Sequence, residues 1–591
     1  METAWQYWTR DIAKRLRQQL DQTISDQDLV VPPDASLGDI SFPCFKLAKE
    51  QKKSPAELAK KIAESFTIQG AEFQSVTSAG PYVNFTLAIG DAVHRIVRDI
   101  ETTGVAYGSS NLGAKQKMLF ECYNPNTHKE IHVGHLRHLI LGVSLTRILR
   151  STGWDVVAMS YHGDVGAHVA KVMWYLVKQA GFALEGLSFT QVDQIVTSVQ
   201  PNDRTGAFLG HLYTDATTKL AEDDTLQKEI SFVQNQLEAH AEAWEHLWQE
   251  TRRWSVEEMK VIFDELGVMI DRQYFESEVY ERGLAMVEEL LTTKVAKMSE
   301  GAVIVDLEDV KLGVFLIRKS DGASLYATKD LALAERKDQE YPKWDRSLYV
   351  TDTRQSFYFK QLFETLRRMG DSRHREHLGY EFLILKEGAM SSRKGNIVTY
   401  VQFRDAVVDY ARSEILKRHP DWTEGKVVHA AWAIAQAGIK FGILRQDNDK
   451  VYTFDLEQAL SFDGATGPYC QYAATRLAAI LRKAKFRVSS PEAQKDADLS
   501  RAFDHQTEKM LALTLASFPR VVEAASRDLR PALIAQWCLE AAQCINEFYR
   551  DVPVLDSKDD LLEGRLRLAS AARQVLGQGL DLLGIPLPDE M

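Results

Sequence analysis

Apolar residues follow three different spacings along the chain. In residues 1–112, helical spacing over 44–66 is followed by alternation over 76–87, which predicts a small α+β domain. In residues 113–400, short apolar runs alternate with helical segments, a pattern typical of a parallel sheet with crossover helices. In residues 451–591, apolar residues recur every three or four positions, which predicts a helical bundle.

The central region contains the elements of a Rossmann-like sheet. Strands are expected at 117–123, 154–161 and 346–353, and an amphipathic helix is expected at 136–153, where it ends at a glycine. Residues about 165–290 are acidic and helical, so they are predicted to form an insertion within the nucleotide-binding fold.

The last part of the chain is predicted to be almost entirely helical. Residues 401–450 are expected to form connecting helices. Further helices are expected at 470–486, 507–526, 531–550 and 564–584. We therefore expect a multidomain α/β protein. It has an N-terminal α+β domain, a Rossmann-like parallel-sheet domain with a helical insertion, and a C-terminal all-α helical bundle.

Length and composition limit the class of protein. The chain has 591 residues, of which 45% are apolar and 26% charged, so it is too long for one core and too apolar to be disordered. Its longest apolar runs fall far short of the ~20 residues that a membrane span requires. The first 20 residues predict an amphipathic surface helix and not a secretion signal.

Net charge and cysteine spacing limit which partners and which cellular compartment we expect. The net charge of −12 argues against a protein coated in nucleic acid, but it allows local basic faces. The five cysteines have no CxxC spacing, which predicts a reducing cytoplasm and no structural zinc site.

The most informative stretch is HVGH, His132 to His135, which follows a strand and opens a helix. A helix start presents unpaired N–H groups and attracts phosphate. Gly134 has no side chain, so a flat base can lie against the backbone, and both histidines can donate hydrogen bonds to phosphate oxygens. The competing interpretation is a pair of surface histidines at a helix cap, because short motifs recur by chance.

A second loop, KEGAMSSRKGNIV at 386–398, follows the apolar segment 381–385. It is small, polar and cationic, and its glycines at 388 and 395 would let it move, so that Ser391, Ser392, Arg393 and Lys394 could close over a triphosphate. The competing interpretation is a solvated turn.

These motifs resemble those of a known enzyme family. HVGH is similar to the HIGH motif, and MSSRKGN to the KMSKS loop, of class I aminoacyl-tRNA synthetases. NPNTHKEIHVGHLRH resembles the arginyl-tRNA synthetases in particular. Similar segments extend over nearly the whole chain, at 320–337, 349–361, 461–476 and 580–591. Several long matches in order are far more specific than HVGH alone.

The resemblance implies an arginine–tRNA ligase. Such an enzyme activates L-arginine with ATP to arginyl-adenylate, transfers arginine to the 3′ end of tRNA(Arg), and releases AMP and pyrophosphate. It implies that ATP enters with Mg²⁺ as a substrate complex, with no tightly bound cofactor and no protein metal site. It also implies a cytoplasmic monomer without membrane contact, and binding of tRNA before arginine is activated.

The implied ATP-binding residues lie in the two motifs: His132, Gly134, His135, Met390, Ser391, Ser392 and Lys394. One departure matters, because Ala389 and Ser392 stand where KMSKS has lysines. Lys129, three residues before HVGH, matches a lysine that similar synthetases use as a substitute. We therefore expect Lys129 to act with the two histidines in catalysis. Residues 297–299 look more like KMSKS, but they precede the YATKD segment and are interpreted as ordinary sequence.

The implied arginine-binding residues are acidic and polar: Glu121, Asn124, Asn126, Tyr326, Asp330 and Gln355. A guanidinium favours planar carboxylate partners, and a lysine ammonium cannot satisfy the same fork of acceptors. Tyr326 and Asp330 stand four residues apart at a helix start and so share one face. Outside this resemblance, Asp330 would be interpreted as a helix-start carboxylate and Tyr326 as a core aromatic.

The implied tRNA-binding residues lie at the two ends of the chain: Tyr82, Asn84, Tyr469, Tyr472, Asn546, Tyr549 and Met591. The first two match the domain that touches the tRNA corner, and the others match positions near the anticodon. Aromatic and amide side chains suit unstacked bases. For any one of them, packing between helices is an equally good interpretation.

Three alternatives stay open at this point. A class I synthetase for cysteine needs zinc-ligating cysteines, and one for glutamate needs cations where Glu121 and Asp330 stand. A paralogue that binds tRNA without charging it is supported only by the altered KMSKS loop. A small-molecule adenylyltransferase leaves the long helical C-terminus without a role.

Overall fold

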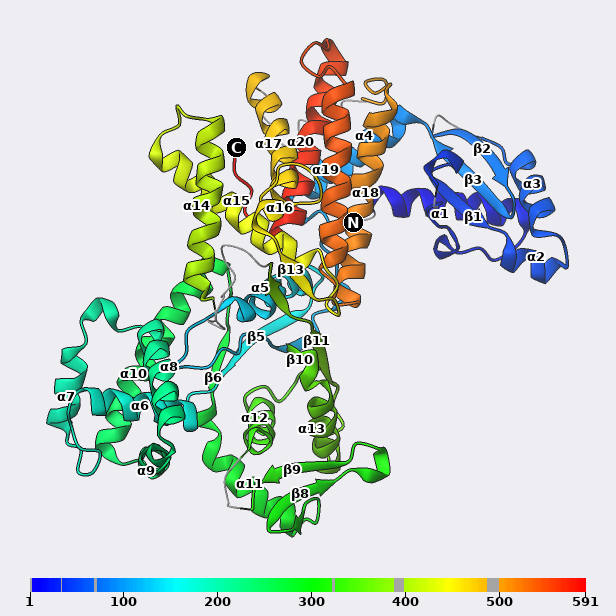
Figure 1. Ribbon diagram of the computed structural model, residues 1–591. Helices are drawn as coiled ribbons and strands as arrows, with labels where there is room; N and C mark the ends of the chain where they lie inside the picture. Colours follow the sequence, from blue (N-terminus) through cyan, green and yellow to red (C-terminus); the bar gives the residue numbers. More distant parts are fainter. Residues whose placement is uncertain (1–2, 33, 69–71, 321–324, 387–397, 486–498) are drawn as a thin grey trace.

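The computed structural model describes residues 3–32, 34–68, 72–320, 325–386, 398–485 and 499–591. Figure 1 shows a central sheet with the C-terminal helices above it and two lobes below it. The N-terminal domain stands apart at the far right of this view.

The N-terminal domain packs helices on an antiparallel sheet with strand order β1-β3-β2. Its elements are α1 (Ala4–Leu20), β1 (Ile40–Pro43), α2 (Phe45–Gln51), α3 (Pro55–Ser65), β2 (Phe73–Ala79), β3 (Tyr82–Leu87) and α4 (Ile89–Thr103), with 3-10 turns at Asp26–Asp28, Ala35–Leu37 and Gly104–Ala106. The single helix expected at 44–66 is divided in two. Lys52 ends α2 with a φ of 53°, and Ser54 caps α3.

The central sheet is parallel throughout, with strand order β11-β10-β4-β5-β6. Its strands are β4 (Lys117–Glu121), β5 (Asp155–His162), β6 (Arg272–Phe275), β10 (Arg346–Asp352) and β11 (Arg375–Tyr380). The chain builds outward from β4 to β5 and β6, then crosses to β10 and β11 on the other side. This confirms the predicted Rossmann-like sheet. Ligands bind in such sheets at the carboxyl ends of the strands, where the strand order reverses.

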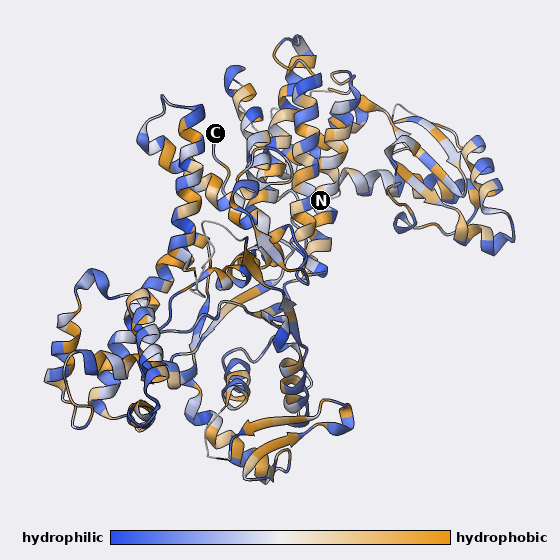
Figure 2. Ribbon diagram, viewed as in Figure 1, coloured by the Kyte–Doolittle hydropathy of each residue, from blue (hydrophilic) through white to orange (hydrophobic). Residues whose placement is uncertain are grey.

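Helix α5 (Val133–Ser151) carries HVGH at its start and is buried along almost its whole length. In Figure 2 the neighbouring strands are largely orange, which is typical of a parallel sheet covered on both faces. The buried Arg137 donates to the carbonyls of Ile443 at 3.1 Å and Asp447 at 2.9 Å. Ser144 donates to Leu582 O at 2.9 Å. The candidate site is therefore anchored directly to the C-terminal helices.

A helical lobe follows β5, at the lower left of Figure 1. It contains α6 (Ala167–Gln179), α7 (Phe189–Ser198), α8 (Gly206–Glu222), α9 (Gln227–Glu238) and α10 (Glu242–Leu266), with 3-10 turns at Pro201–Asp203 and Asp224–Leu226. It has its own hydrophobic core, which includes Trp174 and Leu209. The helical region ends earlier than the expected residue 290. Gly267, with a φ of 76°, caps α10, and the chain then returns to the sheet as β6.

A second lobe follows β6 and carries a small antiparallel sheet, β7-β8-β9. Its elements are α11 (Tyr280–Thr292), β7 (Lys297–Ser299), β8 (Ala302–Asp306), β9 (Val314–Arg318), α12 (Tyr326–Glu340) and, after β10, α13 (Ser356–Arg368), with 3-10 turns at Glu276–Glu278, Glu308–Val310 and Thr353–Gln355. The segment that resembles KMSKS by chance is strand β7. Its Lys297 pairs with Asp306 at 2.6 Å.

Connecting elements lead from the sheet to the bundle. They are β12 (Leu383–Leu385), α14 (Tyr400–Arg418), α15 (Glu424–Leu444), β13 (Tyr452–Phe454) and α16 (Leu456–Ala459). Strands β12 and β13 pair with each other, outside the main sheet. Helix α15 is long and apolar enough to cross a membrane, but 78% of its most apolar window is buried inside the protein.

The C-terminal bundle consists of α17 (Gly467–Lys483), α18 (Gln506–Arg527), α19 (Ala532–Asp551) and α20 (Asp559–Leu582). This confirms the predicted helical bundle. Its apolar faces join one continuous core with α5 and with the N-terminal α4. The charged pair Arg567 and Glu101 crosses from α20 to α4.

Candidate active site

The first turn of α5 is closed by its own histidines. His132 is the N-cap, and its Nδ1 accepts from Gly134 N at 3.1 Å. His135 Nδ1 accepts from His132 N, also at 3.1 Å. The two ring centres lie 3.9 Å apart. A Cβ at Gly134 would lie 2.8 Å from the His132 ring, so glycine is required for this cap. The cap explains Gly134 more directly than the expected approach of a flat base.

Both HVGH histidines are neutral at pH 7. Burial and the nearby Lys129 lower the pKa of His132, and burial together with His132 lowers the pKa of His135 strongly. Because each Nδ1 accepts a hydrogen bond, each ring carries its proton on Nε2. The pair therefore offers two neutral N–H donors beside the helix start. This arrangement suits phosphate oxygens without adding permanent charge.

Lys129 lies on a loop that the helical lobe holds in place. The preceding His128 has a φ of 57°, donates from its backbone N to Ser255 Oγ at 2.9 Å, and places Nε2 2.9 Å from Thr251 Oγ1. The Lys129 ammonium lies 4.9 Å from the ring centre of Tyr213 on α8. Since Lys129 helps to lower the pKa of His132 and His135, its charge acts on the HVGH turn.

The expected triphosphate loop lies outside the described residues. Met390, Ser391, Ser392 and Lys394 belong to this segment. Its far end is anchored at HVGH, because Val133 N donates to Val398 O at 3.1 Å.

Glu121 ends β4 and is almost fully buried. Its Oε2 pairs with Lys337, which has no exposed side chain, and its Oε1 accepts from Asn124 Nδ2 at 3.1 Å. Asn124 Oδ1 in turn accepts from Tyr161 N at 2.8 Å. Both oxygens of Glu121 and the amide of Asn124 are therefore engaged within the protein. These contacts fix the orientation of both side chains, and each carboxylate oxygen keeps a further lone pair with which it can accept from a ligand.

Glu276 is a buried acid beside the predicted arginine-binding residues, and the sequence interpretation missed it. It directly follows β6, is almost fully buried and pairs with Lys329 on α12. A Cβ at Gly163 would lie 2.6 Å from Asn126 Oδ1 and 3.5 Å from Glu276 Oε1, so these two groups flank the same turn after β5. Its place directly after a short strand was the available signal.

Asp330 differs from the other two acids. Its Oδ2 accepts from the Tyr358 hydroxyl, and it forms no ion pair with any described residue. Desolvation, followed by the charges of Glu121 and Glu276, raises its pKa to about 7. The Tyr161 hydroxyl near the same acids is buried without a hydrogen-bond partner among the described residues. Asp330 is therefore the one acid of these three that has no lysine partner among the described residues.

The remaining predicted arginine-binding residues lie at the rim. Tyr326 begins α12 and is 68% exposed, which excludes the core-aromatic interpretation. Gln355 precedes α13 and is exposed. Both stand on the side of the sheet where β10 ends. The structure thus brings a buried acidic floor and exposed polar groups to one edge.

Part of the predicted tRNA-binding set forms a cluster on the bundle. Arg476 on α17 donates to Asn546 Oδ1 at 3.0 Å and Tyr472 Oη at 3.3 Å. Its guanidinium lies 4.5 Å from the ring centre of Tyr472 and 4.9 Å from that of Tyr549. Arg476 lay in a matched segment but had no predicted role.

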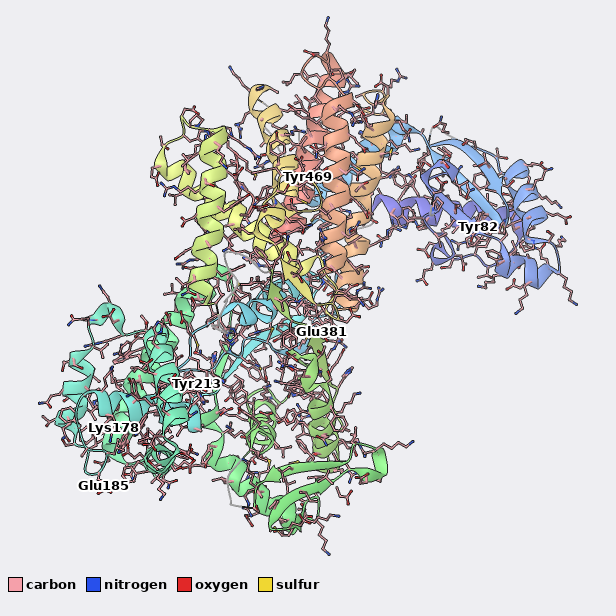
Figure 3. The ribbon with its side chains drawn as sticks, in the orientation of Figure 1. Tyr82, Lys178, Glu185, Tyr213, Glu381 and Tyr469 are labelled. Carbon is pink, nitrogen blue, oxygen red and sulfur yellow. The ribbon has the colours of Figure 1, made fainter. Side chains whose placement is uncertain are left out.

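The cluster continues across the connecting helices. The Phe462 ring meets the Tyr472 ring edge-on at 6.2 Å, and Arg418 lies 4.2 Å over Phe462. We call this series the aromatic ladder: Arg418, Phe462, Tyr472, Arg476 and Tyr549. Tyr469 and the terminal Met591 lie outside it and pack partly against the core. Figure 3 labels Tyr469 among the C-terminal helices.

The two predicted residues of the N-terminal domain differ in accessibility. Tyr82 is half-buried at the start of β3, against Phe45 at 5.7 Å. Asn84 is only 1% exposed and accepts from Ser41 Oγ. The turn at Gly38 covers Asn84, since a Cβ there would lie 3.3 Å from Asn84 Cβ. The side chain of Asn84 is therefore buried within the domain, whereas part of Tyr82 is accessible.

Two further searches concern metals and thiols. No group of three or more His, Cys, Asp or Glu side chains that could hold a metal ion occurs in the part of the chain that the structure describes. All five cysteines are free, and burial raises the pKa of the Cys44 thiol to about 11.

Comparison with known proteins covers almost the whole chain. Residues 97–456 match the family model for the catalytic domain of class I (R) tRNA synthetases. Residues 470–591 match the DALR anticodon binding domain, and residues 6–87 match the arginyl tRNA synthetase N terminal domain.

Individual relatives agree with these models. The chain is 35% identical to an arginine–tRNA ligase of Bdellovibrio bacteriovorus, over 95% of this chain and 94% of that one. It is 31% identical to an arginine–tRNA ligase of Clostridioides difficile, over 95% of each. The solved arginyl-tRNA synthetase of Thermus thermophilus has the same fold, with a TM-score of 0.75, 24% identity and full coverage of both chains.

Proposed function

The chain belongs to the class I arginyl-tRNA synthetases, and we propose that the carboxyl edge of its sheet is where arginine and ATP react. It activates L-arginine with ATP to arginyl-adenylate and transfers arginine to the 3′ end of tRNA(Arg). AMP and pyrophosphate are released. No side chain has to form a covalent bond with the substrates. The rate enhancement therefore comes from positioning the reacting groups and from stabilising the charge of the transition state.

Asp330 is the observation that supports the arginine pocket. Of the three pocket acids, Glu121 and Glu276 already have lysine partners, and Asp330 has none among the described residues. A desolvated carboxylate without a cation binds a guanidinium strongly. Tyr326, Asn126 and Gln355 then contact the remaining parts of arginine. Glu121 and Asn124, oriented by Lys337 and Tyr161, complete the arginine-binding set.

The phosphate side uses neutral donors and one cation. His132 and His135 donate from Nε2 to phosphate oxygens, and Lys129 supplies the positive charge that the altered KMSKS loop lacks. Gly134 permits the cap that orients His132. Mg²⁺ enters with the triphosphate, because phosphates and water are its usual ligands. Met390, Ser391, Ser392 and Lys394 are expected to close this side.

The tRNA side uses the bundle and the N-terminal domain. Tyr472, Asn546 and Tyr549 belong to a polar aromatic surface of the kind that stacks on single-stranded bases. Tyr469 and Met591 border it, and Tyr82 contacts the tRNA corner. We further propose that the protein works as a cytoplasmic monomer and activates arginine only with tRNA bound. The five free cysteines support a reducing setting.

Aminoacylation assays test this assignment. The purified chain is incubated with ATP, total tRNA and each amino acid in turn, and only arginine is expected to be esterified. Esterification of another amino acid, or of none, contradicts the proposal. Pyrophosphate exchange with and without tRNA tests whether activation depends on tRNA.

The role of Lys129 has its own test. Lys129→Ala is expected to lower kcat of aminoacylation more than about tenfold, because one charge-assisted contact to phosphate is lost. A rate near that of the unaltered protein rules out Lys129 as the phosphate cation.

A further inference from the structure

Two ammonium groups share one aromatic ring beside the HVGH turn. Lys129 Nζ lies 4.9 Å, and Lys171 Nζ 5.6 Å, from the ring centre of Tyr213. The two lysines and the tyrosine come from three separate elements: Lys129 from the loop before α5, Lys171 from helix α6 and Tyr213 from helix α8. In Figure 3, Tyr213 lies at the side of the helical lobe that faces the sheet, and Lys178 lies farther out in the lobe. The two cations therefore meet at the boundary between lobe and active site.

The two lysines lack acidic partners. Among the described residues, neither Lys129 nor Lys171 forms an ion pair with a carboxylate, whereas Lys178 on the same helix pairs with Glu229 Oε2 at 3.2 Å. The nearest acid in sequence, Glu130, bonds instead to the side chain of Thr399. Two like charges beside one ring repel each other, and an anion that contacts both offsets this repulsion. The phenol ring of Tyr213 carries no net charge, so it cannot serve as that anion.

Helix α8 is packed closely enough to fix this geometry. A Cβ at Gly210 would lie 3.0 Å from Glu130 N, so α8 rests directly on the peptide that follows Lys129. From the other side, α10 holds His128 through Thr251 and Ser255. The helical lobe thus grips the Lys129 loop on both sides. The position of the ammonium follows from the position of the lobe.

We propose that Lys129 and Lys171, held by Tyr213, form a cradle for a phosphate group on the inner face of the helical lobe. This rests on the proposed role of Lys129. Lys171 is then a further phosphate-binding residue, and Tyr213 is a positioning residue. Ammonium groups bind phosphate as point charges, so the cradle recognises anionic oxygens whatever they are attached to. The triphosphate of ATP and the backbone of the tRNA 3′ end both provide them.

Four variants test the cradle by steady-state aminoacylation with ATP and tRNA varied separately. Lys171→Met keeps the length of the side chain and removes its charge, and it is expected to raise one of the two KM values about tenfold. Tyr213→Leu removes the ring and is expected to raise the same KM. Tyr213→Phe keeps the ring and is expected to behave like the unaltered protein. Lys178→Met, on the same helix but outside the cradle, is the matched control.

The two sources of phosphate give different results. A raised KM for ATP with an unchanged KM for tRNA identifies the triphosphate. A raised KM for tRNA identifies the tRNA backbone. In that case the slope of the logarithm of tRNA affinity against the logarithm of salt concentration is also smaller by about one. If Lys171→Met changes neither KM, or if Lys178→Met changes the same KM equally, the cradle is overturned. Thermal melting of each variant checks that it folds. If Tyr213→Leu unfolds, the KM values of Lys171→Met and Tyr213→Phe still test whether the cradle binds phosphate.

Failure of the cradle is distinguishable from failure of the Lys129 assignment. An impaired Lys129→Ala with a normal Lys171→Met overturns the cradle and keeps Lys129 as the phosphate cation. A normal Lys129→Ala overturns both, because the cradle needs both charges.

Discussion

The proposed arginine pocket and the aromatic ladder both combine charged and planar groups, but two of the pocket acids are buried whereas the ladder is partly exposed to water. The pocket buries Glu121 and Glu276 and compensates each with a lysine, leaving Asp330 without an ion pair among the described residues. The ladder leaves Tyr549 44% exposed and relies on one guanidinium between two rings. An interaction between desolvated charges is strong and selective for its ligand. Stacking on exposed rings is weaker and accepts bases of any sequence.

This contrast predicts where mutations are most costly. A buried charge that loses its partner keeps its desolvation penalty, so single changes in the pocket are expected to affect the reaction severely. A ring lost from the ladder removes only its own stacking, because water replaces it.

Asp330→Asn is expected to lower kcat/KM for arginine about a thousandfold, because a buried guanidinium then lacks its charged partner. The measurement is aminoacylation with arginine varied at saturating ATP and tRNA. Glu335→Gln on the same helix is the control, since Glu335 pairs with Arg282 at 2.6 Å outside the pocket. A loss of less than tenfold in Asp330→Asn shows that another acid carries the guanidinium.

The raised pKa of Asp330 predicts a pH dependence of arginine binding. With a pKa of about 7 in the empty pocket, Asp330 must release a proton before it pairs with the guanidinium. Affinity is therefore full above pH 7 and falls about tenfold for each unit below it. Arginine binds the ionised form of Asp330, and a raised pKa keeps Asp330 protonated up to about pH 7. The affinity for arginine therefore increases as pH rises. Calorimetric titration with arginine from pH 5.5 to 8 measures this, and Asp330→Asn is expected to remove the slope.

Tyr549→Ala is expected to raise KM for tRNA about tenfold and leave KM for arginine unchanged, because one base loses its stacking partner. Tyr549→Phe keeps the ring and is expected to restore binding. Gln543→Ala, an exposed change on the same helix, is the control. Equal effects of Tyr549→Ala on arginine and tRNA would show that the ladder is coupled to the pocket.

The same contrast separates what the sequence could predict from what it could not. Alternation of short apolar runs and helices identifies the parallel sheet, and HVGH after β4 identifies the edge at which ligands bind. Local spacing cannot reveal that Lys337 reaches Glu121, because the two lie 216 positions apart and meet only when β4 and α12 pack. Glu276 escaped notice for the same reason, since its place depends on the return of β6 to the sheet after the helical lobe. Which buried acid is paired with which lysine depends on residues far apart in the sequence, so local patterns do not reveal it.

Asn84 is the position where the sequence interpretation and the packing differ most, and it provides the smallest expected effect on tRNA. The resemblance implied that Asn84 contacts the tRNA corner, but the turn at Gly38 covers it. Asn84→Ala removes an acceptor from the buried Ser41 hydroxyl and is expected to destabilise the protein by about 1–3 kcal/mol. KM for tRNA is expected to change less than about twofold, whereas Tyr82→Ala raises it several-fold by removing a stacking surface. Chemical denaturation and tRNA titration of both variants measure these effects, and a larger rise in KM for Asn84→Ala than for Tyr82→Ala would place Asn84 at the tRNA surface after all.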